Sequence, residues 1–241
     1  GGRGDQDAGD STAAVVGSMD AGATQYSARL TAQTGGEEIV AALTESVQSL
    51  FLEFKERNGR IPQHVVVFRD GVSEGQYDQL LAPHTGELAQ IKHAAELCGY
   101  PQDSIKVTFV VCTKGHSTRL VYKTAGPYLN VCPGLVVGEG ITSNQYVEFY
   151  LNSHVAIQGT CRPCRYTLLH DEVGFKLCEL QLLIYWTCFL FARCNRSVSY
   201  ATPAYYAHWA SKRAATLAGA GATRAQMREI SDILCKQMFW V

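Results

Sequence analysis

Two short apolar runs, separated by a long helical pattern, constrain the fold of this 241-residue chain more than any other feature. The runs His64–Phe68 and Val107–Cys112 are both typical of buried strands. Between them, a helical pattern covers Gln76 to Leu97 and is broken at Pro83. Strands separated by helices of this length predict an α/β fold, here in a single domain.

The segments before and after this unit complete the predicted order of elements. Thr12–Met19 and Tyr26–Thr34 are joined by a short turn and predict a β-hairpin. An amphipathic helix is expected from Glu37 to Arg57, ended by Asn58-Gly59. The later elements are expected to be strands at Gly134–Ile141, Tyr146–Ile157 and Tyr166–Leu169, then helices at Phe175–Cys194, Pro203–Leu217 and Thr223–Lys236.

The helix expected at Phe175–Cys194 is the most apolar segment of the chain. It is apolar nearly all round, which predicts a position in the middle of the molecule. Its longest apolar run, Leu180–Ala192, is interrupted by Gln181 and is shorter than the roughly 20 residues that a membrane span needs. We therefore expect a buried helix and no membrane partner.

Charge is divided unevenly along the chain, although the formal net charge is only −1. Residues 1–105 hold 7 Lys and Arg against 15 Asp and Glu, whereas residues 106–241 hold 14 against 7. This asymmetry is typical of an acidic, metal-binding half and a second half that faces polyanions. Chance scatter over a solvated surface is the alternative that composition alone leaves open.

The nine cysteines are an odd number without a repeating frame. They favour reduced thiols in a reducing compartment over a disulfide scaffold. Only Cys161 and Cys164 have a CxxC spacing, and no second Cys or His pair at a matching spacing completes a zinc site. A strand-like segment follows them where a redox pair would need a helix, so two ordinary thiols in a turn are expected.

Asp70 is the most informative single position for function. It follows the apolar run His64–Phe68 directly and precedes Gly71, so it lies beyond the carboxyl end of a predicted strand. That is where α/β folds place their ligand sites. A turn or helix-capping Asp is the alternative, and it would be preferred if Asp70 stood alone.

Asp70 does not stand alone, because it belongs to one of five recognisable segments. The segments are Ala14–Asp20, Phe68–Gln76, Ser153–Pro163, Arg193–Ser199 and Pro203–His208. Each resembles a signature segment of Argonaute PIWI domains of the eukaryotic type, and the five occur in the order and spacing of that family. The resemblance extends from Ala14 to the aromatic C-terminus.

The resemblance implies a ribonuclease H-like mixed sheet flanked by helices and a metal-dependent endonuclease. In that family two Asp, one Glu and one His or third Asp surround two Mg²⁺ (or Mn²⁺) ions. Carboxylate oxygens suit such cations, and two ions about 4 Å apart can stabilise both the attacking and the leaving oxygen at a phosphate. By this resemblance Asp70 and His208 are metal ligands, and Glu38, Asp70 and His208 are catalytic.

Glu38 and His208 each have a simpler alternative. A shift of one residue would exchange Glu38 with Glu37, although Ile39-Val40 follows Glu38 as it does in the family. A first-turn acid that complements the helix dipole is the simpler explanation of Glu38. The simpler explanation of His208 is a histidine of the core or of the surface without a catalytic role.

The chain departs from the family at its front. In the family the first catalytic Asp ends a strand just upstream of the segment that matches Ser11–Asp20, and neither Asp20 nor the acids in the flexible segment expected at residues 1–10 match it. The resemblance therefore implies a PIWI domain over residues 11–241 that lacks its N-terminal strand. Because that strand would be central in the sheet, we expect the chain alone neither to cleave nor to fold robustly, and to belong to a longer polypeptide.

Basic and polar residues in the second half match guide-contacting positions of the family. Such contacts supply most of the affinity for a nucleic-acid backbone without reading its sequence. The matching residues are Lys114, Arg119, His154, Arg162, Arg193, Ser199, Tyr205 and Arg213, of which Arg213 resembles the residue near the guide's 5′-phosphate. A solvated Lys or Arg is the simpler explanation of any one cation. Gly115 and Ser117 make the first run less basic than in the family, which predicts weaker guide contact there.

Three functions remain open. Guide-RNA-directed cleavage of target RNA is favoured because three of the four ligands are retained, and a non-cleaving guide-binding scaffold for RNA silencing is the alternative. The third function is a redox or zinc-binding protein that uses Cys161 and Cys164. It would require that the five segments resemble the family by chance. The implied partners are a small guide RNA, a complementary target RNA, the MID and PAZ domains and silencing proteins. The implied location is the cytoplasm, with the nucleus as the alternative.

Overall fold

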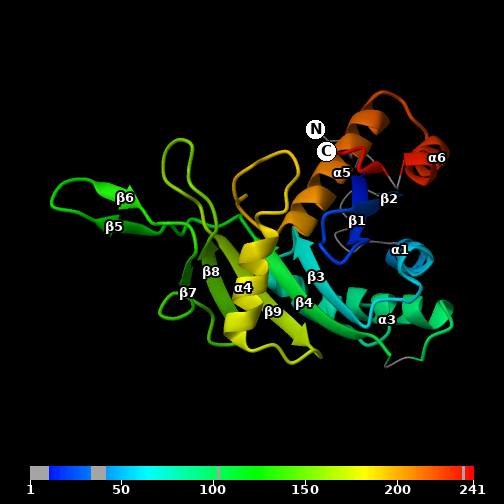
Figure 1. Cartoon of the computed structure of the whole chain (residues 1–241), viewed down its shortest axis with the longest axis horizontal. Coiled ribbons are helices and arrows are strands. Elements are labelled where there is room, and N and C mark those ends of the chain that lie inside the picture. Colours follow the sequence, from blue (N-terminus) through cyan, green and yellow to red (C-terminus); the bar gives the residue numbers. More distant parts are fainter. Residues whose placement is uncertain (1–10, 34–41, 102–103, 235–236) are drawn as a thin grey trace, which may run out of the picture.

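The computed structural model describes residues 11–33, 42–101, 104–234 and 237–241. Its centre is a five-stranded mixed sheet in the order β3-β4-β9-β8-β7, shown in Figure 1. The strands are β3 (His64–Asp70), β4 (Lys106–Thr113), β7 (Leu135–Val137), β8 (Val147–Asn152) and β9 (Cys164–Asp171). The flexible segment predicted at residues 1–10 lies outside the described residues.

Two smaller sheets accompany the main one. β1 (Ser11–Ser18) and β2 (Tyr26–Gln33) form an antiparallel pair beside it, while β5 (Val121–Lys123) and β6 (Tyr128–Asn130) form a short hairpin that projects away from the body of the molecule (Figure 1). The helices are α1 (Leu43–Asn58), α2 (Tyr77–Leu80), α3 (Glu87–Leu97), α4 (Leu177–Thr187), α5 (Thr202–Gly219) and α6 (Arg224–Leu234), with a short 3₁₀ turn at Glu74–Gln76.

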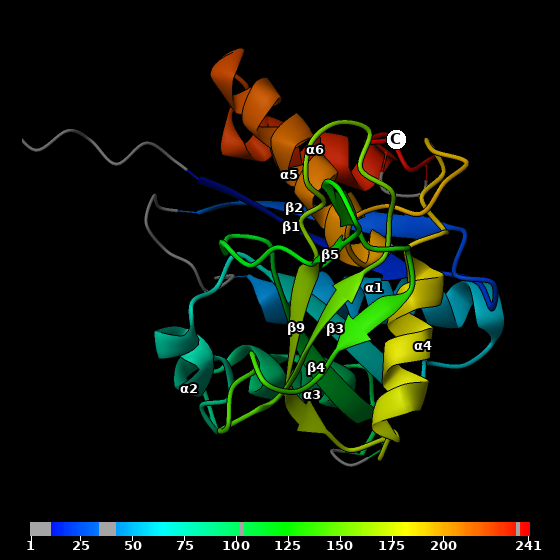
Figure 2. The same ribbon diagram turned by 90° about the vertical axis from the view of Figure 1, so that its left-hand side faces the viewer.

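Alternate residues of β4 supply the two halves of the core. Phe109 and Val111 pack with residues of α1 and α3 on one face of the sheet, whereas Val110 and Cys112 pack with α4 and the start of α5 on the other. The side chains of a strand point alternately to its two faces. β4 therefore holds the two helical layers together, and Figure 2 shows α3 and α4 at different sides of the sheet.

Most predicted elements are confirmed. The hairpin is present, β3 and β4 run parallel with α2 and α3 between them, and the predicted break in that helical pattern is real. Gly59 ends α1 with φ of 73°, a left-handed conformation that glycine adopts readily. Within the described residues α1 begins at Leu43, and the part of the prediction before Ala42 lies outside them.

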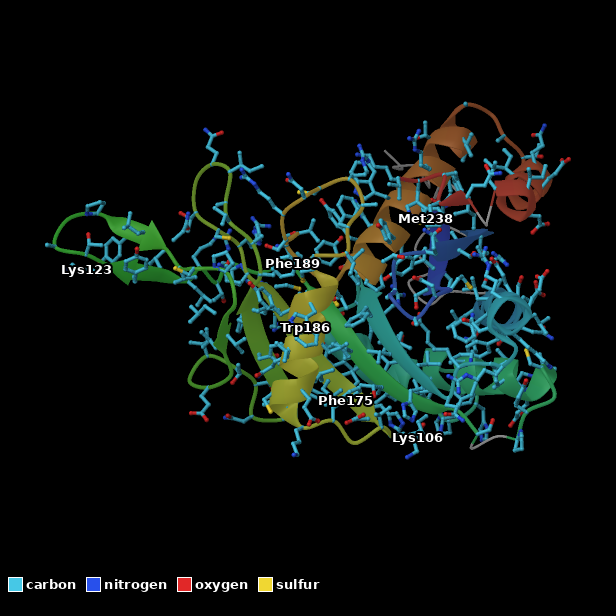
Figure 3. All side chains as sticks on the ribbon, in the orientation of Figure 1. Lys106, Lys123, Phe175, Trp186, Phe189 and Met238 are labelled. Atoms are coloured by element: carbon cyan, nitrogen blue, oxygen red, sulfur yellow. The ribbon has the colours of Figure 1, made fainter. Side chains whose placement is uncertain are left out.

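Two predictions of burial are wrong. β3 is partly exposed along its length, because a strand pairs with only one of its edges in the described chain. The helix predicted at Phe175–Cys194 ends at Thr187, and it lies on the surface with Leu182 46%, Trp186 60% and, just beyond it, Phe189 50% exposed (Figure 3). The apolar surface of α4 is larger than the area that the sheet covers. The apolar composition alone therefore predicted too deep a position for this helix.

Two further features of the fold concern the second half of the chain. The hairpin β5–β6 was not predicted, since three-residue strands carry little periodicity. Among the described residues, none of the helices combines the length and the apolar character that crossing a membrane would require.

Candidate functional site

Asp70 lies at the carboxyl end of β3, where the chain turns away from the sheet. Gly71 makes the turn with φ of 80°, which disfavours any residue with a side chain. Burial raises the pKa of the Asp70 carboxyl, against the lowering effects of the Gly71 N–H and of the nearby charges of His208, Arg69 and Lys114. The fold thus brings together Asp70, His208 and Lys114, three residues that the sequence singled out.

His208 reaches this site from α5, which packs against both β1 and β3. Pro203 lies in the first turn of α5, where its missing N–H is not needed. The His208 side chain is exposed, and its ring centroid lies 6.3 Å from that of Trp209. The site therefore combines a partly buried carboxylate with an exposed imidazole.

Lys114 connects the site to two loops. Its Nζ donates to the carbonyl of Arg162 at 2.9 Å and to the carbonyl of Ser199 at 3.4 Å. Burial lowers the pKa of Lys114, while Cys164 and Cys161 act in the opposite direction. Three of the predicted guide contacts are consequently held in one small region beyond the end of β4.

His154 lies in the same region, beside Cys161. Its Nε2 is 3.4 Å from the Cys161 Sγ, which also donates to the Asn152 Oδ1 at 2.8 Å. Burial, and then the charge of Lys114, lower the pKa of His154 to about 4. His154 is therefore neutral at pH 7, so it can contact a phosphate only as a neutral hydrogen-bonding group.

Cys161 and Cys164 are ordinary free thiols, as predicted, but only Cys161 lies in the loop before β9. Both are buried free thiols, and Cys164 is the first residue of β9. Burial is the main cause that raises the pKa of Cys161. A buried thiol with a raised pKa is a poor nucleophile, which removes the feature on which a redox function would rest.

Tyr200 is a residue of the site that sequence reasoning missed. It is buried, and its pKa is raised by burial and then by the charge of Asp70. Tyr205 packs edge-on against it with ring centroids 5.0 Å apart. Tyr200 therefore packs against Tyr205 within reach of the Asp70 charge, and the only signal in the sequence was its place directly after Ser199.

The other predicted cations are exposed and more widely spread. The Arg193 guanidinium lies 4.9 Å from the ring centroid of Trp209, next to His208 in sequence. Arg119 donates to the carbonyl of Thr118 at 2.8 Å. Arg213 follows His208 by five residues, about 1.4 helical turns, so the two side chains leave α5 on different sides. Arg162 belongs to the Asp70 region because its carbonyl accepts a hydrogen bond from Lys114. Arg213 lies outside that region.

The described residues offer a partial ligand set for a divalent cation. Glu38 lies outside them, and within them no group of three or more His, Cys, Asp or Glu side chains is arranged to hold a metal. Asp70 and His208 remain. Magnesium commonly takes one or two carboxylates together with waters and substrate phosphates, and a cation would offset the cost of ionising a buried carboxyl. Asp70 and His208 fit that role.

Comparison with known proteins finds similarity to one protein family. The model of the Piwi domain matches residues 2–218. Protein argonaute 2 of Oryza sativa is 42% identical over 207 residues, covering 84% of this chain and 19% of the relative. Protein argonaute 5 of Arabidopsis thaliana is 40% identical over 231 residues, covering 87% and 23%. The chain thus spans about a fifth of the length of these relatives.

Solved structures agree with the sequence comparisons. Kluyveromyces polysporus Argonaute with a guide RNA superposes with a TM-score of 0.85 at 29% identity, over 98% of this chain and 31% of that one. The C-terminal lobe of a budding yeast Argonaute gives 0.81 at 25% identity, over 96% and 54%. These likenesses confirm the predicted ribonuclease H-like mixed sheet flanked by helices.

Proposed function

The chain belongs to the Piwi domain family, and from that premise we propose that it binds a duplex of small guide RNA and target RNA and directs cleavage of the target strand. The activity is proposed for a full-length Argonaute that carries this chain as its Piwi domain. One observation carries the proposal: Asp70, at the carboxyl end of β3, and His208, on α5, line the same cleft between β1 and β3, where the charges of His208 and Lys114 act on the Asp70 carboxyl.

Each of these residues has a distinct part in the proposed reaction. Asp70 and His208 would hold Mg²⁺ or Mn²⁺ beside the scissile phosphate, with Glu38 as a further acid. The ion, when bound, supplies charge stabilisation for phosphoryl chemistry. The Asp70 carboxylate supplies a negative charge at a fixed place on a rigid strand end. Lys114 holds the neighbouring loops in position through the Arg162 and Ser199 carbonyls.

The basic surface supports the proposed RNA partners. Arg119, Arg162, Arg193 and Arg213 are exposed and carry charge that backbone phosphates attract. The guide RNA in the Kluyveromyces polysporus structure supports RNA as the ligand. The proposal includes MID and PAZ domains and silencing proteins as further partners. It also includes a reducing compartment, which is the cytoplasm or, as the alternative, the nucleus. The cysteines of the described part of the chain are free thiols, as such a compartment requires.

A guide-binding scaffold that does not cut is the second candidate. The exposed arginines support it, because guide binding needs their charge whether or not the target strand is cut. The RNA-binding surface would serve such a scaffold equally well. The two functions differ only in the fate of the target strand.

Target cleavage distinguishes the two functions. A full-length Argonaute with this Piwi domain is loaded with a defined guide RNA and given a matched target with Mg²⁺ or Mn²⁺. We expect one cut opposite the guide, and we expect Asp70→Asn to abolish it while guide affinity is kept. Asp78→Asn, an exposed acid on α2, is the matched control. Guide and target binding without any cut would establish the scaffold and leave Asp70 without a catalytic role.

Salt dependence tests the RNA-binding surface separately. Arg162→Ala and Arg213→Ala should each weaken guide binding and reduce the slope of log affinity against log salt by about one. Lys123→Ala, on the projecting hairpin β5–β6, is the control cation (Figure 3). An unchanged slope in either arginine variant would remove that residue from the interface.

A further inference from the structure

The hairpin β5–β6 exposes apolar and aromatic side chains that have no core beneath them. Val121, Tyr122, Tyr128 and Leu129 are 42%, 47%, 65% and 42% exposed. None of the apolar cores formed by the described residues includes a residue of this hairpin, and Figure 1 shows it projecting from the body of the molecule. These side chains therefore add little to the stability of the fold. Apolar groups gathered on a surface in this way commonly mark a binding site.

The hairpin is nevertheless fixed in shape and position. An isolated two-stranded hairpin is only marginally stable in water. Here the Thr124 Oγ1 donates to the carbonyl of Pro127 at 2.8 Å and closes the turn. At the base, the Asn130 Nδ2 donates to the carbonyl of Gly159 at 2.9 Å, and the Asn130 Oδ1 accepts from the Cys161 N–H at 2.8 Å. A surface that is ordered before binding loses less entropy when a ligand binds to it.

The base of the hairpin is continuous with the proposed RNA-binding surface. Asn130 joins it to the loop that carries Arg162, and β5 begins two residues after Arg119. From residue 104 to residue 138 the sequence contains three lysines and one arginine, but no Asp or Glu. No carboxylate of this segment would repel a phosphate backbone, and its cations would attract one. The charge of the hairpin and its surroundings therefore favours a polyanion as the ligand.

Pairing across the hairpin places a cation beside an aromatic ring. Lys123 is the partner of Tyr128, and Tyr122 is the partner of Leu129. Cross-strand partners lie on the same face of a hairpin, with their Cβ atoms about 5 Å apart. One face thus presents an ammonium group beside a phenol ring, and the other presents a second phenol ring beside an apolar side chain. An unpaired nucleotide has the matching groups, because its base stacks on aromatic rings and its phosphate attracts a cation.

We propose that the hairpin β5–β6 binds an unpaired segment of the target RNA, beyond the part of the target that pairs with the guide. This proposal rests on the proposed function of the chain. Tyr122 and Tyr128 would each stack on a base, and Lys123 would contact the backbone. A target RNA is longer than a small guide and continues as a single strand outside the duplex, whereas the guide is paired with a matched target. The target is therefore the strand that supplies unpaired nucleotides.

Other ligands match the hairpin less well. A polypeptide strand could add to one of its edges, but β5 and β6 have three residues each. Such short edges offer few backbone hydrogen bonds to another strand. A base-paired RNA duplex keeps its bases stacked on one another, so they are not free to stack on tyrosine rings. Unpaired RNA uses both rings and the cation at once.

The first test compares two target RNAs on a guide-loaded full-length Argonaute with this Piwi domain. One target ends with the duplex, and the other carries roughly ten unpaired nucleotides on each side. We expect Tyr122→Ala combined with Tyr128→Ala to weaken binding of the extended target about tenfold, because two stacked bases are lost. Guide binding and the short target should be unaffected.

The matched control for this test keeps both rings. Tyr122→Phe combined with Tyr128→Phe should bind the extended target within about twofold of the parent, because stacking needs the ring and not the hydroxyl. Equal losses of affinity for the two targets in the alanine variant would show that the hairpin acts on the duplex. That result, or no loss for the extended target, would overturn the proposal.

Salt dependence tests the lysine separately. Lys123→Ala should reduce the slope of log affinity against log salt by about 0.7 for the extended target, as expected for one phosphate contact in a single strand. The slopes for guide and short target should not change. Lys106→Ala is the control cation, because Lys106 is exposed and lies far from Lys123 (Figure 3). An unchanged slope for Lys123→Ala with the extended target would overturn the assigned backbone contact.

Photocrosslinking locates the contact directly. Extended targets carry a photoreactive thiouridine at single positions outside the duplex, and the irradiated complexes are digested and analysed by mass spectrometry. We expect crosslinks to residues 121–130 from one side of the duplex. Crosslinks confined to other segments would overturn the proposal. So would slow amide exchange of residues 121–130 before target is added, because another part of the protein would then cover the hairpin.

Failure of this proposal can be distinguished from failure of the proposed function. A protein that binds guide and short target, and whose hairpin variants behave like the parent with the extended target, refutes the role of the hairpin alone. A protein that binds no guide RNA refutes the proposed function and, with it, the role of the hairpin.

Discussion

Strands β3 and β4 are neighbours with similar sequences and different environments. They pair in parallel from His64 with Lys106 to Asp70 with Cys112, and both are rich in valine. β4 has strands on both edges and is buried from Val107 to Cys112, whereas β3 has β4 on one edge and the cleft on the other. The burial of a strand is therefore set by how many of its edges are paired, and not by its apolar residues alone.

The structures on the two sides of β3 are also held in place by different contacts. β4 is held by apolar side chains on both faces. The hairpin on the far side of the cleft makes polar contacts with α1, in which the buried Glu53 accepts from Ser27 at 2.5 Å and from Arg29 at 2.9 Å. Arg57, on α1 itself, donates to the same carboxylate at 2.6 Å. The hairpin thus combines apolar packing with a buried polar cluster at Glu53, whereas the faces of β4 pack against apolar side chains.

Truncating one aromatic residue in each strand gives the largest expected contrast. Phe109→Ala in β4 removes a fully buried ring and should cost about 4 kcal/mol of unfolding free energy. Phe68→Ala in β3 removes a partly buried ring and should cost about 2 kcal/mol. Urea denaturation of both variants measures the difference. Equal costs would show that the cleft edge is as tightly packed as the centre of the sheet.

Removing the charge of Glu53 tests the polar attachment of the hairpin. Glu53→Gln leaves two arginines without their buried partner and should cost about 3 kcal/mol. Asp78→Asn, at an exposed position of α2, should stay within about 0.5 kcal/mol of the parent in the same urea experiment. A loss below 1 kcal/mol for Glu53→Gln would mean that apolar contacts alone hold the hairpin in place.

Hydrogen exchange should resolve the two strands residue by residue. From Thr108 to Cys112 β4 lies between two strands, with a register shift at Phe109/Val110, whereas alternate amides of β3 point into the cleft. We expect strong protection in this part of β4 and an alternation of about 100-fold in β3, measured by NMR. Uniform protection along β3 would show that its free edge is covered in solution.

Two carboxyls at opposite ends of the sheet should respond to pH with opposite signs. Burial raises the pKa of Asp70 above 3.8, so the stability of the fold falls as pH rises through that range, and Asp70→Asn should stabilise the chain at pH 7. Burial also disfavours ionised Glu172, but its hydrogen bonds from Lys92 and the Val107 N–H hold its pKa at about 2. Its contribution is present above pH 4.5 and lost as pH falls towards 2.

The expected effects of these two substitutions are small. The Glu172 side chain is 28% exposed, and solvent weakens its ion pair, so Glu172→Gln should cost no more than about 1 kcal/mol at pH 7, and its effect should vanish near pH 2. The gain from Asp70→Asn should vanish below pH 3.8. Thermal unfolding between pH 2 and 7 measures both. Two effects of the same sign would contradict the difference between the two environments.

The predictable part of the candidate site is the part with a local cause. Asp70 could be placed at a strand end because an apolar run precedes it and a turn glycine follows it. Its approach to His208, 138 positions later in the chain, could be anticipated only through the family resemblance. Tyr200 was missed, because its place directly after Ser199 is not enough to distinguish it from other buried tyrosines.

The sequence by itself determined the local elements and their order. Periodicity, capping glycines and prolines act over a few residues, so the hairpin, α1, α3, α5 and the separate strands β3 and β4 followed from them. Only the tertiary structure decided that β3 borders a cleft, that α4 exposes Trp186 and that Lys114 joins two distant loops. The physical reason is that burial and pairing depend on neighbours from remote parts of the chain, which an apolar run cannot specify.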